Sequence, residues 1–204
     1  MTGTFLNLPE EKRRRIFSAA AQEFGKNGYR PGSLDAVVRI AGISKGGLYE
    51  YIKSKEELFL GTVDYCYRSL YGYLQSRLSS SVSLWPAALL DRLEAVAEIA
   101  IDYYLSHPAE IGLLVQAGRI EDVDLSARVE AIFHLRFEEM FGDARFPDSF
   151  PRERVMDLLR WLLQKTRNVF FSGLQDTKDP QTLKNDYLDE WRFILGVLRK
   201  GLKD

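Results

Sequence analysis

The 204-residue sequence is poor in the side chains on which metal and redox sites depend. It has one cysteine, Cys66, and two histidines, His107 and His134. A single cysteine excludes an internal disulfide framework, and the two histidines lie far apart in sequence without a ligand pair nearby. We therefore expect no metal site and no cofactor. The cysteine usage suits a reducing compartment, and we expect the protein to be cytoplasmic.

Long apolar runs and catalytic motifs are missing as well. No stretch approaches the ~20 uninterrupted apolar residues of a membrane-spanning helix, and the N-terminus lacks a secretory pattern. No carboxylate pair accompanies a histidine, and there is neither a nucleophile motif nor a glycine-rich phosphate loop. An enzyme is therefore the least supported interpretation, and we expect no catalytic residues. Cys66 has no local base, so a redox-sensing role is a minor alternative.

The chain also lacks a strong charge of either sign, because its net charge is only −1. The charge is nevertheless uneven: residues 1–60 carry ten Lys/Arg against seven Asp/Glu, and the remainder is acidic on balance. The basic groups include a run at 12–15 (Lys-Arg-Arg-Arg). Such a run is more often a solvated face than a site, although it could contact a flanking DNA phosphate.

No segment shows the alternation of a β-strand, so we predict an all-α fold. Four prolines, at 86, 108, 151 and 180, stand where helices can begin. Helical periodicity and these breaks predict helices near 9–27, 34–41, 44–51, 55–80, 86–106, 108–119, 124–142, 151–175 and 180–202.

The most informative segment is 41–58, which we interpret as the turn and second helix of a helix-turn-helix followed by the start of another helix. Leu34, Val37, Val38 and Ala41 follow helical spacing. Gly42 then stands where a left-handed residue would end this helix. Ser44 is a good N-cap for the next helix, on which Leu48 and Ile52 can pack back onto the first. The pattern predicts two short helices meeting at a tight corner.

The second helix of this corner has a poor helical sequence and a sharp end. Gly46 and Gly47 each lower helix propensity by up to ~1 kcal/mol relative to alanine, so tertiary packing must hold the helix. Glycine also lets the backbone approach another surface closely, and the major groove of DNA is such a surface. Ser-Lys-Glu-Glu at 54–57 fits a capping box, so the next helix should begin there.

Residues 16–59 resemble the DNA-binding domain of the tetracycline-repressor (TetR) family of bacterial transcriptional regulators. The most specific stretches are Ala-Gly-Ile-Ser-Lys-Gly at 41–46 and Leu-Tyr-Glu-Tyr-Ile-Lys-Ser-Lys-Glu-Glu-Leu at 48–58. The resemblance implies a three-helix DNA-binding domain at 1–54, with 44–50 as recognition helix, and a helical effector-binding and dimerisation domain at 55–204. It implies DNA contacts by Ser33, Ser44, Lys45, Gly46, Gly47, Tyr49, Tyr51 and Lys55.

Two positions depart from the family pattern. Val38 stands where the family usually has alanine, which would alter packing between the first helices. Glu50 stands where many members carry an aromatic residue or histidine. A carboxylate there could accept from a cytosine amino group, but a solvent-facing or lysine-paired role is the simpler interpretation.

The last two predicted helices carry broad apolar stripes. In the TetR family such a pair forms a four-helix dimer interface, and a dimer would read two half-sites of an operator. The alternative is that both stripes face the core of one protomer. The predicted interface residues are Leu158, Leu162, Val169, Phe170, Trp191, Ile194, Leu195 and Leu198.

Between the two ends, aromatic-rich helices could line a cavity for an apolar or aromatic small-molecule effector. The candidates are Tyr103, His107, Phe133, His134, Phe137 and Trp161, although most of them could be ordinary core aromatics. The leading hypothesis is a homodimeric repressor released from operator DNA by the effector. A DNA-binding regulator or architectural protein without an effector is the alternative. The sequence does not identify the operator or the effector.

Overall fold

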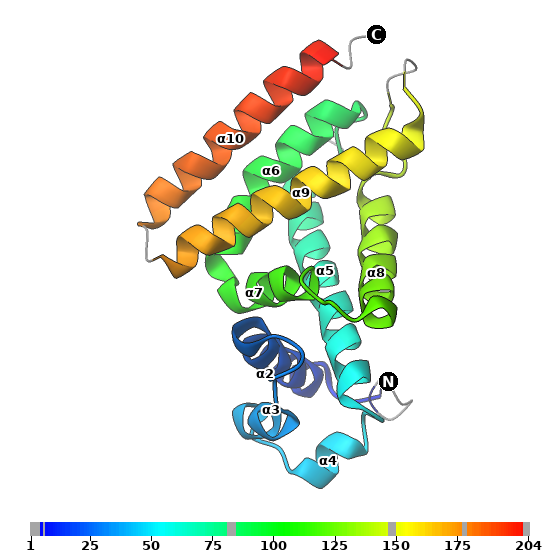
Figure 1. Ribbon diagram of the computed structural model, residues 1–204, viewed down its shortest axis with the longest axis vertical. Helices are drawn as coiled ribbons and strands as arrows, with labels where there is room; N and C mark the ends of the chain where they lie inside the picture. Colours follow the sequence, from blue (N-terminus) through cyan, green and yellow to red (C-terminus); the bar gives the residue numbers. More distant parts are fainter. Residues whose placement is uncertain (1–4, 6, 81–84, 147–149, 177–178, 202–204) are drawn as a thin grey trace. The chain divides into compact units, whose positions relative to one another are not determined.

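The computed structural model describes residues 5, 7–80, 85–146, 150–176 and 179–201 (Figure 1). Its helices are α2 (Glu10–Asn27), α3 (Leu34–Ala41), α4 (Lys45–Tyr49), α5 (Lys55–Ser80), α6 (Leu89–Ser106), α7 (Pro108–Ala117), α8 (Val123–Phe141), α9 (Arg152–Gln175) and α10 (Pro180–Gly201). The predicted all-α fold is confirmed. In the described part of the chain the only bridge of strand type joins Ala88 and Arg145.

The chain divides into two compact units. Unit 1 comprises residues 1–69 and 108–134, and unit 2 comprises residues 70–107 and 135–204. Both α5 and α8 therefore contribute to each unit. The boundary predicted from the sequence, between 54 and 55, is a different kind of division, and it stays a prediction.

Unit 1 is organised around α2, which packs against α3 and α7. Gly25 allows this contact, because a Cβ at that position would lie 2.6 Å from the carbonyl oxygen of Ala109. Phe24 and Phe59 are fully buried and meet edge to face with ring centroids 5.4 Å apart. This contact stabilises the packing of α2 against the first part of α5.

Unit 2 is built on α10, which packs against α6 and α9. Tyr187 and Trp191 on α10 are buried in this contact. At the rim of the contact, Lys184 pairs with Asp102 at 2.6 Å, and Arg199 pairs with Asp91 at 2.9 Å. One face of α10 is therefore committed to the core of the protomer.

Helix limits agree with the sequence prediction to within a few residues, and the largest differences have local causes. Helix α6 begins at Leu89 rather than at 86, because Ala87 accepts a backbone hydrogen bond from Arg145 N–H (2.7 Å). Leu89 N–H donates to the Arg145 carbonyl at 3.1 Å. These residues thus pair with a distant segment instead of continuing the helix. The predicted end of the last helix at 202 lies outside the described residues.

No helix in the described ranges combines the length and apolar character needed to cross a membrane.

Candidate nucleic-acid interface

The turn between α3 and α4 has the geometry that its sequence predicts. Gly42 adopts the left-handed conformation with φ 63° and ψ 41°. Its N–H bonds back to α3, and Arg15 on α2 donates from Nη2 to the Ala41 carbonyl at 2.6 Å. Glycine meets the positive φ without strain, and the guanidinium satisfies a carbonyl that the helix end leaves free. The turn is therefore stabilised both by the conformation of Gly42 and by the hydrogen bond from Arg15 on α2.

Helix α4 is only five residues long, shorter than the predicted 44–50. Ser44 caps it, because Gly47 N–H donates to the Ser44 hydroxyl at 3.0 Å. Leu48 is fully buried, as is Ile52 beyond the helix end, so the helix is held by tertiary packing as predicted. The opposite face of the helix is left open to solvent.

The two glycines of α4 have different roles. A Cβ on Gly47 would lie 3.0 Å from Ser44 Oγ and would crowd the cap. A Cβ on Gly46 would meet no described atom within 4 Å outside its own helix. Gly46 thus lowers helix propensity without a packing reason in the described protein. An external surface that approaches the backbone closely would supply that reason.

The residue before α3 carries a second capping hydroxyl. Ser33 caps α3, and its Oγ accepts from the N–H groups of Asp35 (3.2 Å) and Ala36 (3.5 Å). Its N–H donates to Glu23 Oε1 at 2.9 Å, which fixes the loop. Because the cap uses only the lone pairs of Ser33, the hydroxyl proton can still be donated to a phosphate.

The two tyrosines predicted to contact phosphates lie in different environments. Tyr49 is 48% exposed, whereas Tyr51 is only 7% exposed. The Tyr51 hydroxyl accepts from Lys12 Nζ at 3.0 Å. Tyr49 is therefore the better placed of the two to contact a ligand, and a contact by Tyr51 would be limited to its hydroxyl group.

Lys55 at the start of α5 is tied to the loop between α2 and α3. Its Nζ donates to the Arg30 carbonyl at 2.9 Å and lies 4.8 Å from the centre of the Tyr29 ring. Burial lowers the pKa of Lys55, while Glu23 acts in the opposite direction. Two ammonium protons remain for other acceptors, so Lys55 can hold the chain and contact a phosphate together.

The predicted capping box at the start of α5 forms with one change. Glu57 N–H donates to Ser54 Oγ at 3.1 Å. The Glu57 carboxylate accepts from the N–H of Lys53 at 2.6 Å, rather than from the N–H of Ser54. The helix therefore begins where the sequence indicates.

Sequence reasoning missed three side chains that shape this surface. Lys12 and Arg15 belong to the basic run, and both are engaged inside the domain through Tyr51 and Ala41. Asp35 forms an ion pair with Lys45 at 2.7 Å. These contacts join residues at least ten positions apart, so no local pattern reveals them. Exposed hydroxyl, phenol and ammonium groups nevertheless gather around α4, and such groups suit contact with a polyanion.

The six predicted effector residues belong to both units and differ in burial. Tyr103 is buried and stacks on His107 with centroids 4.0 Å apart, in unit 2. Phe133 is buried against Tyr67, and its neighbour His134 is exposed, both in unit 1. The other two, both in unit 2, are Phe137, which is buried, and Trp161, which is 60% exposed. Their assignment to an effector site stays a prediction.

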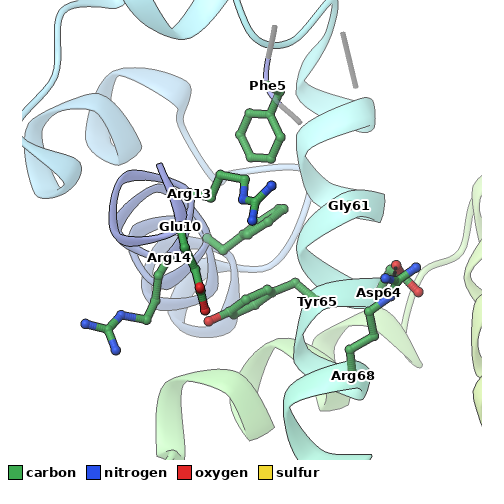
Figure 2. A pocket seen from close by; sticks show the side chains of 9 residues that line it. Phe5, Glu10, Arg13, Arg14, Gly61, Asp64, Tyr65 and Arg68 are labelled. Atoms are coloured by element: carbon green, nitrogen blue, oxygen red, sulfur yellow. Dashed lines mark ion pairs between the residues drawn. The ribbon is translucent and has the colours of Figure 1, made fainter. Parts of the chain in front are cut away.

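Several cavities lie within single units, and two of them have aromatic walls. One cavity of about 440 Å³ in unit 1 has Phe5, Phe17 and Tyr65 among its walls. Figure 2 shows Phe5 and Tyr65 in this lining together with its charged residues. Phe17 and Tyr65 stack at 4.6 Å, and three arginines and two carboxylates give the lining a net charge of +1. A second cavity of about 200 Å³ lies between α9 and α10, beside Phe170 and Tyr187. Neither lining, as far as the described residues define it, includes any of the six predicted effector residues.

Helices α9 and α10 carry two apolar faces rather than one. Of the predicted interface residues, those buried within the protomer are Phe170, Trp191, Leu195 and Leu198. Leu162 and Ile194 are half-buried, whereas Leu158 and Val169 are 40% and 56% exposed. Three large apolar side chains outside the prediction are also exposed: Trp161 (60%), Phe193 (68%) and Val197 (55%). The buried residues hold α9 and α10 in the protomer, and the exposed residues are available to contact a second protomer.

Cys66 is fully buried on α5. Burial raises the pKa of its thiol well above the ordinary value, and Glu110 adds to the rise. The reactive thiolate is therefore scarce at neutral pH, which argues against a redox-sensing role.

Comparison with known proteins agrees with this geometry. Residues 16–62 match the family described as bacterial regulatory proteins, tetR family. Over 194 residues the chain is 37% identical to YdgC, an uncharacterized HTH-type transcriptional regulator of Bacillus subtilis, and the match covers 94% of this chain and 95% of YdgC. It is 27% identical over 116 residues to NicS, an HTH-type transcriptional repressor of Pseudomonas putida, covering 55% of this chain but only 51% of NicS.

A solved structure shares the fold. FadR from Bacillus subtilis, a transcriptional regulator crystallised with stearoyl-CoA, superimposes with a TM-score of 0.67 at 14% identity, covering 87% of this chain and 96% of FadR. The match to YdgC over nearly the whole of both chains, together with the matched DNA-binding residues, identifies the family. This chain belongs to the tetR family of bacterial regulatory proteins.

Proposed function

We propose that the protein is a homodimeric transcriptional repressor that inserts α4 into the major groove of operator DNA and releases it when a small-molecule effector binds. The observation that carries the DNA-binding part is the open face of α4. There, Gly46 has no packing role among the described residues, and Ser44, Lys45 and Tyr49 are exposed around it. Ser33, Gly47, Tyr51 and Lys55 would complete the contacts to the phosphate backbone.

The second apolar face of α9 and α10 supports dimerisation. Leu158, Trp161 and Val169 follow helical spacing on α9, and Phe193 and Val197 do so on α10. Gly196 lies between the latter two, and a Cβ there would meet no described atom within 4 Å. An exposed apolar surface of this kind favours contact with another copy. A two-fold dimer would then read half-sites about 34–36 Å apart on one face of the DNA.

Names of similar proteins support repression and response to an effector. NicS is named a repressor, and FadR was solved with stearoyl-CoA. An effector that shifted α5 would move Lys55 and, through it, the DNA-binding helices. Its effect on DNA affinity cannot exceed its preference for one of the two conformations. The linings of the cavities beside Tyr65 and Tyr187 contain none of the six predicted effector residues, and this favours the second candidate, a regulator without an effector.

The dimer is tested by molar mass in solution. Phe193→Glu places a charge on the proposed contact face, and Val123→Glu is the matched control, because Val123 is 80% exposed on α8. We expect the wild type and the control to have the mass of a dimer and Phe193→Glu that of a monomer. A wild-type monomer, or a Phe193→Glu dimer, would contradict the proposed interface.

The operator is found by selecting genomic DNA fragments on the immobilised protein and footprinting the enriched sequence. We expect two related half-sites on one face of the duplex. Adding stearoyl-CoA, and then a panel of apolar and aromatic compounds, tests for release. DNA binding that no compound changes, with repression intact in a reporter strain, would favour the regulator without an effector.

A further inference from the structure

Lys45, the first residue of the proposed recognition helix, is paired across the turn with Asp35. Lys45 Nζ lies 2.7 Å from Asp35 Oδ1, and both side chains are mostly exposed, at 59% and 68%. Asp35 is in the first turn of α3, beside the Ser33 cap. The pair therefore joins the first turns of the two helices that would face DNA.

A carboxylate is an unexpected group at this place, because DNA phosphates repel it. The N-terminus of α3 favours an acidic residue, and this accounts for Asp35 in the free protein. The helix dipole does not account for the contact of Asp35 with Lys45, because a carboxylate interacts favourably with the helix N-terminus whether or not a lysine is paired with it. The contact partly neutralises both groups on the surface that would face DNA, where a free ammonium would bind any phosphate. Asp35 also raises the pKa of Lys45, first through the hydrogen bond and then through its charge.

Pairing leaves part of the ammonium group available. An ammonium has three N–H donors, and Asp35 takes one of them. The other two suit the O6 and N7 acceptors that guanine presents side by side in the major groove. The pair thus favours one position of a donor group and weakens the attraction of its charge to phosphates.

We propose that Asp35 is a positioning residue for DNA reading: it holds Lys45 against indiscriminate phosphate contact and directs it to a guanine in each half-site. This inference depends on the proposed function, because it requires α4 to enter the major groove. When water leaves the groove, the pair becomes stronger than it is in solution, since the local dielectric constant falls.

The inference predicts a loss of selectivity with a gain in general affinity. In Asp35→Asn, the freed Lys45 would neutralise about one more phosphate, so the salt dependence of binding would steepen by roughly 0.9 in log–log slope per protomer. Binding to scrambled DNA would become tighter. The ratio of operator to scrambled affinity would fall by about tenfold, the scale of one good base contact.

The experiment is a double-mutant cycle measured by fluorescence anisotropy, with selected operator and scrambled DNA at several salt concentrations. The proteins are the wild type, Asp35→Asn, Lys45→Ala and the double variant. Glu50→Gln is the matched control, because it removes the same charge from the exposed end of α4. Asp35→Glu tests rescue, and thermal unfolding confirms that each variant is folded.

We expect Asp35→Asn to lose selectivity in the wild-type background and to have no such effect once Lys45 is alanine. Glu50→Gln should tighten binding to both DNAs equally, and Asp35→Glu should keep most of the selectivity. If Asp35→Asn behaves like Glu50→Gln, or acts equally without Lys45, Asp35 is only a distant charge and the inference is wrong. If the wild type itself shows no selectivity, the proposed function fails, and the inference fails with it.

Discussion

Replacing Gly46 by alanine separates the stability of α4 from its function. In the free protein the added methyl group meets no described atom within 4 Å outside its own helix. Alanine in a helix interior is better than glycine by up to ~1 kcal/mol, and roughly half of that is expected near the end of so short a helix. The melting temperature should therefore rise by about 1–2 °C. The same methyl group would hold the backbone away from the groove and weaken operator binding by roughly tenfold or more.

The control is Gly72→Ala on α5. Gly72 is also helical and exposed, and a Cβ there meets no described atom within 4 Å. It should stabilise the protein by up to ~1 kcal/mol without changing the Kd for DNA. Calorimetry and anisotropy on the same samples give both quantities. If Gly46→Ala binds the operator as tightly as the wild type, close backbone approach at Gly46 is refuted. If it destabilises the protein, the open space assigned to this position is wrong.

Three further predictions concern stability and reactivity. Arg15→Gln removes the 2.6 Å contact with the Ala41 carbonyl. The free energy of unfolding, measured by urea denaturation, should fall by about 1 kcal/mol. An unchanged value would show that the turn does not need Arg15. Because Cys66 is buried, it should react with a thiol reagent far more slowly in the folded protein than in denaturant; equal rates would contradict its burial. The hydrogen bond from Arg92 lowers the pKa of Asp143, so this stabilisation is present at neutral pH and is lost as pH falls through the lowered value. Asp143→Asn should thus be less stable than the wild type at neutral pH, and the difference should shrink as the pH falls below the lowered pKa; a difference that is unchanged down to the acid limit of folding would exclude this cause.

The helix-turn-helix could be predicted because its signals are local. Gly42, Ser44 and Ser54 act on backbone groups within four residues of themselves, and the structure gives each the predicted role. Pro108 and Pro180 begin helices and Pro151 precedes one, as predicted, but Pro86 does not, because α6 begins at Leu89. Local chemistry of this kind fixes a helix end unless a distant segment competes for the same backbone groups, as Arg145 does near Pro86.

Contacts between distant segments could not be predicted in this way. The contact of Arg15 with Ala41 and the pair of Lys45 with Asp35 depend on how α2, α3 and α4 pack. A basic run in the sequence gives no indication of which of its members face inward. Aromatic residues are equally ambiguous. The sequence pattern does not distinguish Phe133 from Trp161, yet Phe133 is buried and Trp161 is exposed.

The stripes of α9 and α10 show a related limit. Helical spacing identifies apolar faces, but it does not say how many partners cover them. Phe170 and Trp191 face the protomer core, whereas Val169 and Phe193, next to them in the helical pattern, are exposed. Only the packing of α10 on α6 and α9 separates the two faces.

The most direct test of the central claim is the affinity of the protein for its selected DNA and for a scrambled sequence, at two salt concentrations, with Lys45→Ala Tyr49→Ala as the comparison. Both residues are exposed on α4, so the double variant should remain folded. The account predicts saturable binding that scrambled DNA does not displace and that the double variant loses. Equal binding of both DNAs by the wild type, or selective binding that survives in the double variant, would contradict it.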